Sequence, residues 1–323
     1  MNEPYFLTGA LGCIGAWVAK TLVERGDLLV TFDLGDDRRR LRDVMDPGEL
    51  ARVRFVQGDI TDYDALRRAL EVSLAKKIVH LAGLQVPLCR AAPAQGARVN
   101  VLGTIHVFEA AQELGIERVV YASSAAVYRR SESGRAPSEQ DGCEPSTHYG
   151  VFKRANEGNA RVCFEDGGLS SVGLRPLTVY GVGRDSGLTS GPTCAMKAAV
   201  LGRSFHVPFG GATDFHYVAD TAEAFVECAD RAPRGAHLFN LHGVTAEVAH
   251  VIELIEREEP AARGRITFGG APLPIPPELD GSAIERALPG LQRTSLEEGV
   301  HATMERFRVL ARTGRLDTRD LDP

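Results

Sequence analysis

Long apolar stretches are missing from this chain of 323 residues. A membrane-spanning helix needs roughly 18 or more consecutive apolar residues, and no run approaches that length. The first ten residues, MNEPYFLTGA, have neither the basic start nor the apolar core of a secretory signal peptide. The sequence therefore predicts a cytoplasmic protein with no membrane partner.

Strong charge of one sign is missing as well. The 37 basic and 43 acidic side chains give a formal net charge of −6, which provides no basic surface for nucleic acid or for an anionic membrane. Three arginines follow one another at positions 38–40, but two aspartates precede them. We expect these arginines to form a solvated helix face, and we predict no nucleic-acid partner.

Paired cysteines and metal-binding spacings are also absent. Six cysteines are scattered through the sequence without a CxxC pair: Cys13, Cys89, Cys143, Cys163, Cys194 and Cys228. In a chain of this size such spacing indicates reduced, mostly buried thiols rather than a disulfide framework. No cluster of His, Cys and Asp suggests a metal ion, so we predict no metal site.

Short apolar runs alternate with longer amphipathic stretches over the first 176 residues. The expected strands are 5–8, 28–32, 53–56, 78–81, 118–122 and 172–174, and the expected helices are 14–25, 63–74, 97–114 and 148–164. Continuous apolar strands separated by helices are typical of a parallel sheet that helices cover on both faces. We therefore predict an α/β fold with a doubly wound parallel Rossmann sheet.

Glycine and proline become more frequent after residue 176. Helical periodicity returns at 218–229, 245–258 and 295–311, and GGAPLPIPPELDG at 269–281 is typical of an extended surface loop. We predict a nucleotide-binding domain of residues 1–176, to which 215–243 return. A smaller, mainly helical C-terminal lobe of residues 177–214 and 244–323 would bind the substrate.

The first expected strand runs directly into a glycine-rich turn, Thr8-Gly-Ala-Leu-Gly-Cys-Ile-Gly15, and a helix follows. Glycines allow a tight turn and a close approach of the backbone to a pyrophosphate, and the helix N-terminus offers free N–H groups to the phosphates. Asp33 ends the second strand, where a carboxylate accepts hydrogen bonds from ribose hydroxyls and repels a 2′-phosphate. This favours NAD, although the nearby arginines leave NADP open, and Asp33 as a simple turn cap is the alternative.

Two further strand ends face the same edge of the sheet. Asp59 follows the third strand and is placed to bind the adenine amino group. After the fourth strand, Ala82 and Gly83 allow the backbone to approach the cofactor. His80 lies on an apolar strand, and we expect a hydrogen-bonded core histidine there rather than a ligand.

The strongest catalytic pattern combines a serine after the fifth strand with a YxxxK sequence. Tyr149 and Lys153 are four residues apart and share one helix face. Tyrosine, with a pKa near 10, is a poor acid–base group at neutral pH, but a neighbouring ammonium and the positive nicotinamide ring stabilise the phenolate. Ser124 would hold the substrate oxygen while Tyr149 moves its proton.

Seven motifs follow one another along the chain in this order: TGxxGxxG, the strand-two aspartate, GDI, HLAG, NVLGT, SSAAVY and YxxxK. Over about residues 4–240 this order resembles the extended short-chain dehydrogenase/reductases, and more narrowly the NAD-dependent epimerase/dehydratase family. The resemblance implies that Ser124, Tyr149 and Lys153 are catalytic. It implies that NAD is held by Gly9, Gly12, Cys13, Ile14, Gly15, Asp33, Asp59, Ile60, Leu81, Ala82, Gly83, Asn100, Tyr149, Lys153 and Pro176.

Two positions depart from the nucleotide-sugar members of this family. Thr178 and Thr213 stand where those members commonly carry an asparagine and an arginine for the substrate diphosphate. A diphosphate needs charge-assisted donors, and threonine offers only a neutral hydroxyl. Arg184 and Arg203 can compensate, but the sequence favours a smaller hydroxyl or carbonyl substrate.

We therefore expect an NAD-dependent oxidoreductase that interconverts an alcohol and a carbonyl compound. The alternative is an NAD-dependent sugar epimerase, above all of nucleotide sugars, that returns the hydride to its substrate and recycles bound NAD. A dehydratase is disfavoured because Ala125 and Ala126, rather than acidic residues, follow Ser124. A non-catalytic dinucleotide sensor remains a third hypothesis, against which the retained YxxxK argues.

Other expectations concern the pocket and the assembly. We expect loops 86–93, 182–192 and 208–214 to form the substrate pocket, although loop sequences do not specify the substrate. His206, His216 and His242 are candidates for substrate contact, with a structural role the stronger interpretation. Relatives pair two helices in a four-helix dimer, so helices 97–114 and 148–164 suggest a homodimer.

Overall fold

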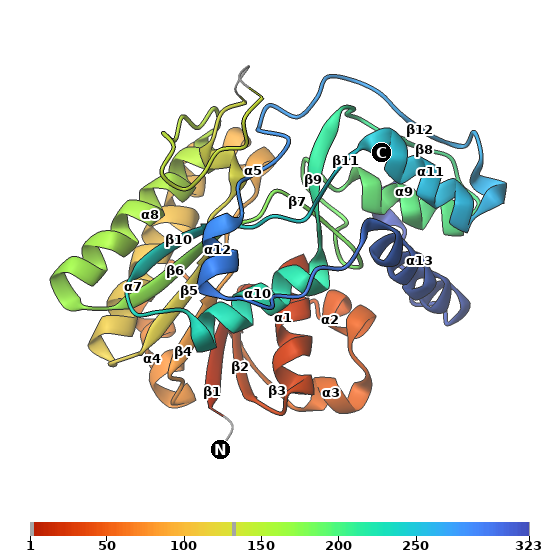
Figure 1. Ribbon diagram of the computed structural model, residues 1–323. Coiled ribbons are helices and arrows are strands. Elements are labelled where there is room, and N and C mark those ends of the chain that lie inside the picture. The colour runs from red at the N-terminus through yellow and green to blue at the C-terminus, as the bar shows by residue number, and fades with distance from the viewer. Residues whose placement is uncertain (1–2, 131–133, 323) are drawn as a thin grey trace.

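The centre of the molecule is a parallel sheet of seven strands in the order β10-β6-β5-β4-β1-β2-β3 (Figure 1). The computed structural model describes residues 3–130 and 134–322. The strands are β1 (Pro4–Thr8), β2 (Leu28–Asp33), β3 (Val53–Gln57), β4 (Lys77–His80), β5 (Arg118–Ala122), β6 (Ser170–Arg175) and β10 (Ala236–Asn240). All six strands expected before residue 176 are present, and the predicted doubly wound sheet is confirmed. The strand order reverses between β1 and β4, where open α/β sheets bind ligands.

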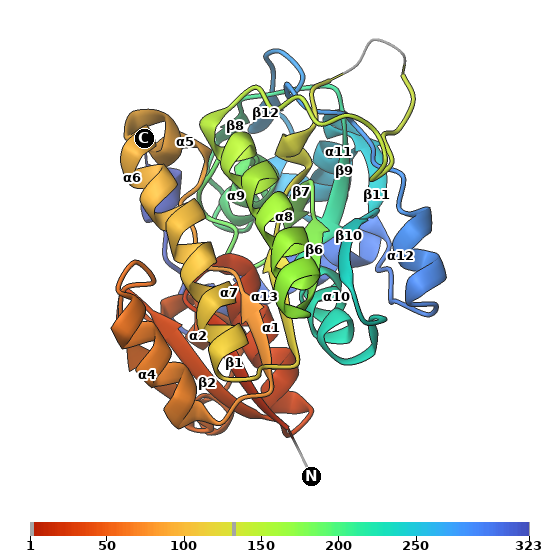
Figure 2. The ribbon, with the colours of Figure 1, turned by 90° about the vertical axis from the view of Figure 1, so that its left-hand side faces the viewer.

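Helices cover both faces because side chains of each strand point alternately to either side. In β1, Tyr5 and Leu7 join the core cluster under α1 and α10, whereas Phe6 joins the cluster under α4 and α7. The first layer comprises α1 (Cys13–Glu24), α10 (Val218–Arg231) and the short α2 (Arg39–Val44) and α3 (Pro47–Ala51). The second comprises α4 (Tyr63–Ser73), α7 (Gly103–Glu113) and α8 (His148–Gly167), which lie in front of the sheet in Figure 2.

The helix expected at 97–114 is interrupted. It begins as α6 (Pro93–Ala97), continues through a π-helical turn at Arg98–Leu102, and only then becomes α7. Such turns are frequent at functional sites, and this one contains Asn100. The preceding α5 (Val86–Ala91) occupies most of the stretch that we predicted as a pocket loop.

The C-terminal lobe combines helices with two small sheets, as expected for a smaller, mainly helical unit. Its elements are β7 (Thr178–Tyr180), α9 (Gly191–Val200), β8 (Phe205–Val207), β9 (Ala212–Tyr217), β11 (Val244–Glu247), α11 (Val248–Glu258), β12 (Ile266–Phe268), α12 (Ser282–Ala287) and α13 (Leu296–Arg312). Strands β11, β9 and β7 form one sheet, and β12 pairs with β8. Single 3₁₀ turns occupy Ala125–Val127, Pro260–Ala262 and Arg319–Leu321.

One predicted helix boundary is wrong. Residues 245–247 belong to β11 rather than to the helix expected at 245–258, because their backbone pairs antiparallel with β9. That partner lies about thirty residues earlier in the sequence, so local periodicity carried no sign of it. Within 3–130 and 134–322, no helix is both long and apolar enough to cross a membrane.

Candidate active site

The glycine turn after β1 has the tight geometry that its sequence predicts. Gly9 has a φ of +75°, and a Cβ there would lie 2.5 Å from the backbone nitrogen of Ala82. A Cβ on Gly15 would lie 2.0 Å from the carbonyl oxygen of Gly9. Both positions therefore require glycine, and the turn delivers the N-terminus of α1 to the edge of the sheet where a pyrophosphate would bind.

Asp33 at the end of β2 is fixed by backbone amides. Its two carboxylate oxygens accept hydrogen bonds from the amides of Leu11 and Leu34, each at 2.9 Å. Burial raises the pKa of Asp33, and these amides together with that of Gly35 act against the rise. The carboxylate is thus held in place beside the glycine turn, as recognition of a ribose requires.

The solvated face predicted at residues 38–40 holds for Arg38, which is exposed, and is wrong for Arg39 and Arg40, which are half-buried. The guanidinium of Arg38 lies 3.7 Å from the centre of the Phe55 ring. Arg40 forms two hydrogen bonds, of 2.6 and 3.1 Å, to the carboxylate of Asp185, and Arg39 donates to the same carboxylate at 3.1 Å. Asp185 comes from a loop about 145 residues later, so local charge patterning did not reveal it. Arg39 and Arg40 therefore have an acidic partner, whereas Arg38 is exposed and stacks on Phe55.

Two adjoining cavities follow the carboxyl ends of the strands. The cofactor-side cavity, of about 710 Å³, is lined by Asp33, Asp59, Ile60 and Ala82 among others. The catalytic cavity, of about 250 Å³, is lined by Cys13, Ile14, Gly15, Ser124, Tyr149, Lys153 and Pro176 among others. Gly9, Gly12, Leu81 and Gly83 line both. The structure therefore brings every predicted site residue to one continuous cleft except Asn100.

Asn100 is buried behind the cleft and supports its wall. Its side-chain oxygen accepts from the amide of Leu84 at 2.7 Å, and its side-chain nitrogen donates to the carbonyl of the same residue at 2.9 Å. A Cβ on Gly83 would lie 3.3 Å from the Asn100 oxygen. Asn100 therefore fixes the segment that follows β4 rather than lining a cavity itself.

The three predicted catalytic side chains meet in the catalytic cavity. The Ser124 hydroxyl accepts from the amide of Ala126 at 3.1 Å and lies close enough to the Tyr149 phenol to lower its pKa. The Lys153 ammonium donates to the carbonyl of Ala122 at 2.6 Å and lies 5.5 Å from the centre of the Tyr149 ring. Tyr149 and Lys153 stand one turn apart on α8, so the predicted shared helix face is observed.

Burial shifts the titration of both α8 side chains. It lowers the pKa of Lys153 to about 8, because a buried ammonium loses its hydration. It raises the pKa of Tyr149, and the hydrogen bond to Ser124 and the positive charge of Arg184 act against that rise. The cavity therefore holds a tyrosine whose pKa burial raises beside a lysine whose pKa burial lowers.

A buried polar network that the sequence analysis missed lies beneath these residues. Glu157 accepts from Ser123 at 2.6 Å and forms two 2.7 Å hydrogen bonds with Arg175, and both charged side chains are buried. Arg175 also donates to the hydroxyl of Tyr128. Glu157 follows Lys153 by four residues, so the same i, i+4 spacing that linked Tyr149 to Lys153 pointed to it. This network holds the end of β5, and with it Ser124, against α8.

His80 is the core histidine that we predicted. Its ring nitrogens contact the hydroxyls of Thr8 at 2.7 Å and Thr104 at 3.0 Å. Burial, together with the charge of Lys153, lowers the pKa of His80 to about 3, so this ring stays neutral. All six cysteines are free, three of them buried and three half-buried.

Residues of the C-terminal lobe close the catalytic cavity. The loop 182–190 contributes Arg184, Leu188 and Thr189, and the proline-rich loop contributes Pro274 and Ile275. The first of these loops was among the three predicted, whereas the proline-rich loop was expected only at the surface. Residues 208–214, also predicted to form the pocket, do not line this cavity.

Thr178 and Thr213, the two departures from the nucleotide-sugar pattern, bind each other. Their hydroxyl oxygens are 2.7 Å apart, and both side chains are buried. Neither residue lines the catalytic cavity. The hydroxyl–hydroxyl pair therefore forms a link between β7 and β9 and presents no charge-assisted donor to a ligand.

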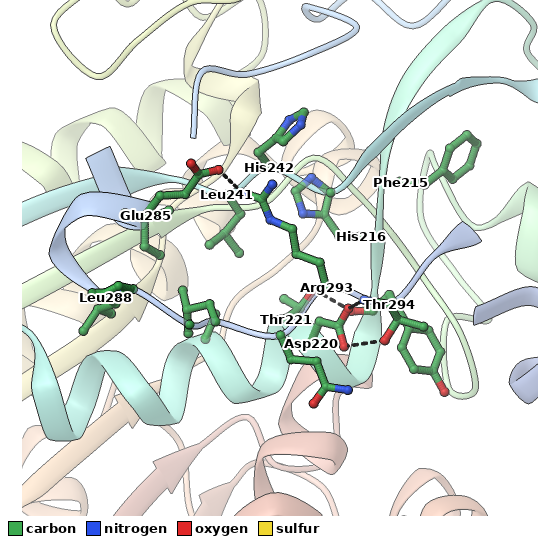
Figure 3. A pocket seen from close by; sticks show the side chains of 18 residues that line it. Phe215, His216, Asp220, Thr221, Leu241, His242, Glu285, Leu288, Arg293 and Thr294 are labelled. Carbon is green, nitrogen blue, oxygen red and sulfur yellow. Dashed lines mark hydrogen bonds and ion pairs between the residues drawn. The ribbon is translucent and has the colours of Figure 1, made fainter. Parts of the chain in front are cut away.

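A separate cavity of about 380 Å³ lies between β9, α12 and residues 288–294. His216 and His242 line it in Figure 3. Their ring nitrogens lie 3.4 and 3.3 Å from the buried carboxylate of Asp214. Although burial works to raise the pKa of Asp214, the two histidines hold it at about 2. These histidines therefore lie outside the catalytic cavity, and among the described residues no group of His, Cys, Asp and Glu is arranged to hold a metal ion.

Comparison with known proteins agrees with this geometry. Residues 5–241 match the model of the NAD dependent epimerase/dehydratase family. The chain belongs to that family. It is 29% identical to a UDP-glucose 4-epimerase of Streptomyces lividans over 276 residues, which cover 80% of this chain and 81% of the relative.

Two solved structures illustrate the range of similar proteins. MoeE5 in complex with UDP-glucose and NAD is 27% identical, with a TM-score of 0.81, and the alignment covers 96% of this chain and 100% of that one. The L-threonine dehydrogenase of Clostridium difficile has a TM-score of 0.82 at 19% identity, covering 95% of this chain and 98% of that one, and shows the shared fold alone. This chain, as a member of the NAD dependent epimerase/dehydratase family, uses NAD as its cofactor, and its glycine turn and Asp33 fit NAD.

Proposed function

We propose that this family member is an NAD-dependent oxidoreductase that interconverts a hydroxyl and a carbonyl group of a small substrate. Ser124, Tyr149 and Lys153 form its acid–base system. The proposal assigns cofactor binding to residues 1–176 with 215–243, and substrate binding to 177–214 and 244–323.

Each of the three side chains has one task in this reaction. In oxidation, the hydroxyl of Ser124 holds the substrate oxygen and the Tyr149 phenolate takes its proton. The Lys153 ammonium stabilises the phenolate, and the carbonyl of Ala122 fixes its position. NAD supplies the hydride acceptor, C4 of the nicotinamide ring. In reduction, Tyr149 returns the proton to the same oxygen.

The Thr178–Thr213 pair is the observation that favours a small substrate. A nucleotide sugar presents a diphosphate, which needs several charge-assisted donors. Here the two positions at which nucleotide-sugar members commonly carry an asparagine and an arginine hold neutral hydroxyls that satisfy each other. The catalytic cavity is about 250 Å³ and continues into the cofactor-side cavity, and the nicotinamide must share it.

The second candidate function is a nucleotide-sugar epimerase that returns the hydride to its substrate. It is favoured by the similarity to the UDP-glucose 4-epimerase of Streptomyces lividans and to MoeE5, which was solved with UDP-glucose and NAD. A further observation fits an enzyme that keeps its NAD bound between turnovers, as an epimerase does. The loop 182–190 lines both cavities and is fastened by Asp185 to Arg39 and Arg40. A fastened loop across the cleft slows cofactor release.

The cofactor content of the purified protein separates the two functions. The protein is purified without added nucleotide and denatured, and released NAD, NADH and NADP are quantified per chain. A dehydrogenase that exchanges its cofactor at each turnover yields substoichiometric NAD. Near-stoichiometric NAD that survives dialysis favours the epimerase.

We also propose a homodimer. The exposed apolar side chains of Leu102, Val151 and Val162 lie on the π-helical turn before α7 and on α8, the helices expected to pair. Light scattering of the eluting protein, with Val151→Glu as the disrupting variant, tests this assembly.

A further inference from the structure

Arg184 is a cation without an acidic partner in the catalytic cavity. Its Nη2 donates to the hydroxyl of Thr189 at 2.9 Å, and its Nε is buried without a hydrogen-bond partner among the described residues. Of the described residues lining this cavity, none is an aspartate or a glutamate, and the other cation, Lys153, donates to a backbone carbonyl. The guanidinium thus retains a donor for a ligand in a cavity that otherwise offers hydroxyls and apolar side chains.

The loop that carries Arg184 is held in one conformation. The next residue, Asp185, is fixed by the two hydrogen bonds from Arg40. Gly183 and Gly187 adopt φ values of +94° and +98°, which favour glycine. A Cβ on Gly187 would lie 2.0 Å from the side-chain oxygen of Gln85 and 3.4 Å from Nη2 of Arg184. The loop therefore directs Asp185 towards α2 and Arg184 into the cavity.

The guanidinium lies on the same side of the cleft as the reacting groups. Arg184, Ser124 and Tyr149 line one cavity, and the charge of Arg184 acts on the phenol of Tyr149. A substrate whose hydroxyl is held by Ser124 and Tyr149 must place another of its groups beside this guanidinium, because the cavity is small.

We propose that Arg184 binds a carboxylate of the substrate, so that the oxidised or reduced compounds are small hydroxy acids or polyhydroxy acids and their oxo counterparts. This inference rests on the proposed dehydrogenase function. Arginine presents a planar fork of donors that matches a carboxylate, and one guanidinium balances one negative charge. The hydroxyls of Ser146 and Thr147, which also line the cavity, suit the remaining hydroxyl groups of such a substrate.

Two other anions would use the same donor. The diphosphate of NAD is one, because Gly183, next to Arg184, lies close to the glycine turn. A Cβ on Gly183 would lie 3.8 Å from Sγ of Cys13. A phosphate ester is the other, but a phosphate dianion at neutral pH calls for more than one partner cation. The cavity lining favours the carboxylate, since besides Arg184 its only cation among the described residues is Lys153, which donates to a backbone carbonyl.

The test compares Arg184→Gln with the wild type, using Arg203→Gln as the matched control. Arg203 is exposed, pairs with Asp322 and lies outside the cavity. The probes are glycerate, gluconate and galacturonate, their neutral counterparts glycerol, sorbitol and galactose, and glycerol phosphate. Binding in the presence of NAD and of NADH is followed by thermal shift, turnover by NADH absorbance, and the affinity for NAD by titration calorimetry.

The expected result has three parts. At least one carboxylate binds and turns over in the wild type better than its neutral counterpart. Arg184→Gln reduces kcat/KM for that acid about 100-fold, as loss of hydrogen bonds to a charged group does, and leaves the affinity for NAD unchanged. The loss for the neutral compound is much smaller and reflects only the missing charge near Tyr149. Arg203→Gln changes none of these quantities.

Each contrary outcome overturns the inference and shows where it fails. Weaker NAD binding by Arg184→Gln, with equal losses for acids and neutral compounds, assigns the guanidinium to the cofactor diphosphate. If the enzyme prefers glycerol phosphate or the neutral compounds, the substrate does not need a carboxylate, and the proposed dehydrogenase function is unaffected. The inference is also overturned if no carboxylate binds in the presence of either NAD or NADH. Epimerisation of a nucleotide sugar without net NADH defeats the proposed function itself.

Discussion

The cofactor-side cavity and the catalytic cavity are built in different ways. Apart from Ser186 and Gly187, the cofactor-side cavity is lined by residues between positions 9 and 99, mostly at strand ends. The catalytic cavity gathers residues from Gly9 to Ile275, including two loops of the C-terminal lobe. The first is shaped largely by backbone, and the second by side chains that distant segments bring together. Short sequence motifs therefore predict the cofactor, whereas they do not predict the substrate.

The largest expected effect concerns the catalytic cavity alone. Tyr149→Phe removes the hydroxyl that exchanges the substrate proton and keeps the ring. We expect kcat to fall about 10²–10⁴-fold, the usual contribution of general acid–base catalysis, with unchanged affinity for NAD. Steady-state kinetics and NAD titration measure the two quantities. Full turnover by a Tyr149→Phe protein that binds NAD normally would remove the acid–base assignment.

The corresponding change in the cofactor-side motif is Gly15→Ala. The new Cβ would lie 2.0 Å from the Gly9 carbonyl oxygen, and overpacking of this kind costs about 1–3 kcal/mol or more. We expect NAD binding to weaken by about 100-fold and the melting temperature to fall. Gly158→Ala, on α8 with open space around it, is the control and should be neutral or slightly stabilising. Equal behaviour of the two variants would show that the glycine turn is not tightly packed.

Asp33→Asn tests the recognition of the ribose. Loss of a charged acceptor costs about 1.5–3 kcal/mol, so we expect NAD binding to weaken roughly tenfold or more. NADP binding should weaken less or improve, because the repulsion of its 2′-phosphate disappears. Asp37→Asn removes an exposed carboxylate from the same cavity and serves as the control. An unchanged NAD/NADP ratio in Asp33→Asn would contradict the role of Asp33.

The sequence specified the backbone-built part of the site almost completely. The glycine turn, Asp33 and the strand ends are local patterns, and the strands predicted from apolar runs are present with their expected order of helices. Tyr149 and Lys153 were found for the same reason, since both stand on one helix.

The remaining features depend on contacts between distant segments. Asp185 neutralises arginines about 145 residues away, the Thr178–Thr213 pair joins two strands, and residues 245–247 form a strand because β9 is beside them. Local periodicity and charge patterning contain no information on such pairs. The proline-rich loop was expected at the surface for its composition, and its place over the catalytic cavity became visible only in three dimensions.

A smaller effect is expected from the threonine pair. Thr178→Val leaves the buried hydroxyl of Thr213 without its partner, which costs about 1–3 kcal/mol in the free energy of unfolding. The double variant Thr178→Val/Thr213→Val should recover much of this loss, because both polar groups are then gone. Denaturant unfolding of Thr178→Val, Thr213→Val and the double variant gives the coupling energy. Additive losses would show that the two hydroxyls do not bind each other.

The smallest effect concerns pH. Burial raises the pKa of Tyr149, and the hydrogen bond to Ser124 lowers it. Oxidation needs the phenolate, so its rate should increase with pH, and reduction should show the opposite trend. Ser124→Ala removes a group that lowers the pKa and should therefore move the rising limb of oxidation to higher pH. A shift to lower pH would contradict the assigned hydrogen bond.

The most direct test of net hydride transfer is the stoichiometry of NADH. The protein is incubated with excess NAD and a hydroxy acid that binds the NADH complex, and NADH and carbonyl product are quantified against enzyme over many turnovers. The dehydrogenase account predicts one NADH for each product molecule, in amounts well above the enzyme concentration, and loss of both in Tyr149→Phe. A product that accumulates while NADH never exceeds the enzyme would contradict it and establish a reaction that recycles bound NAD.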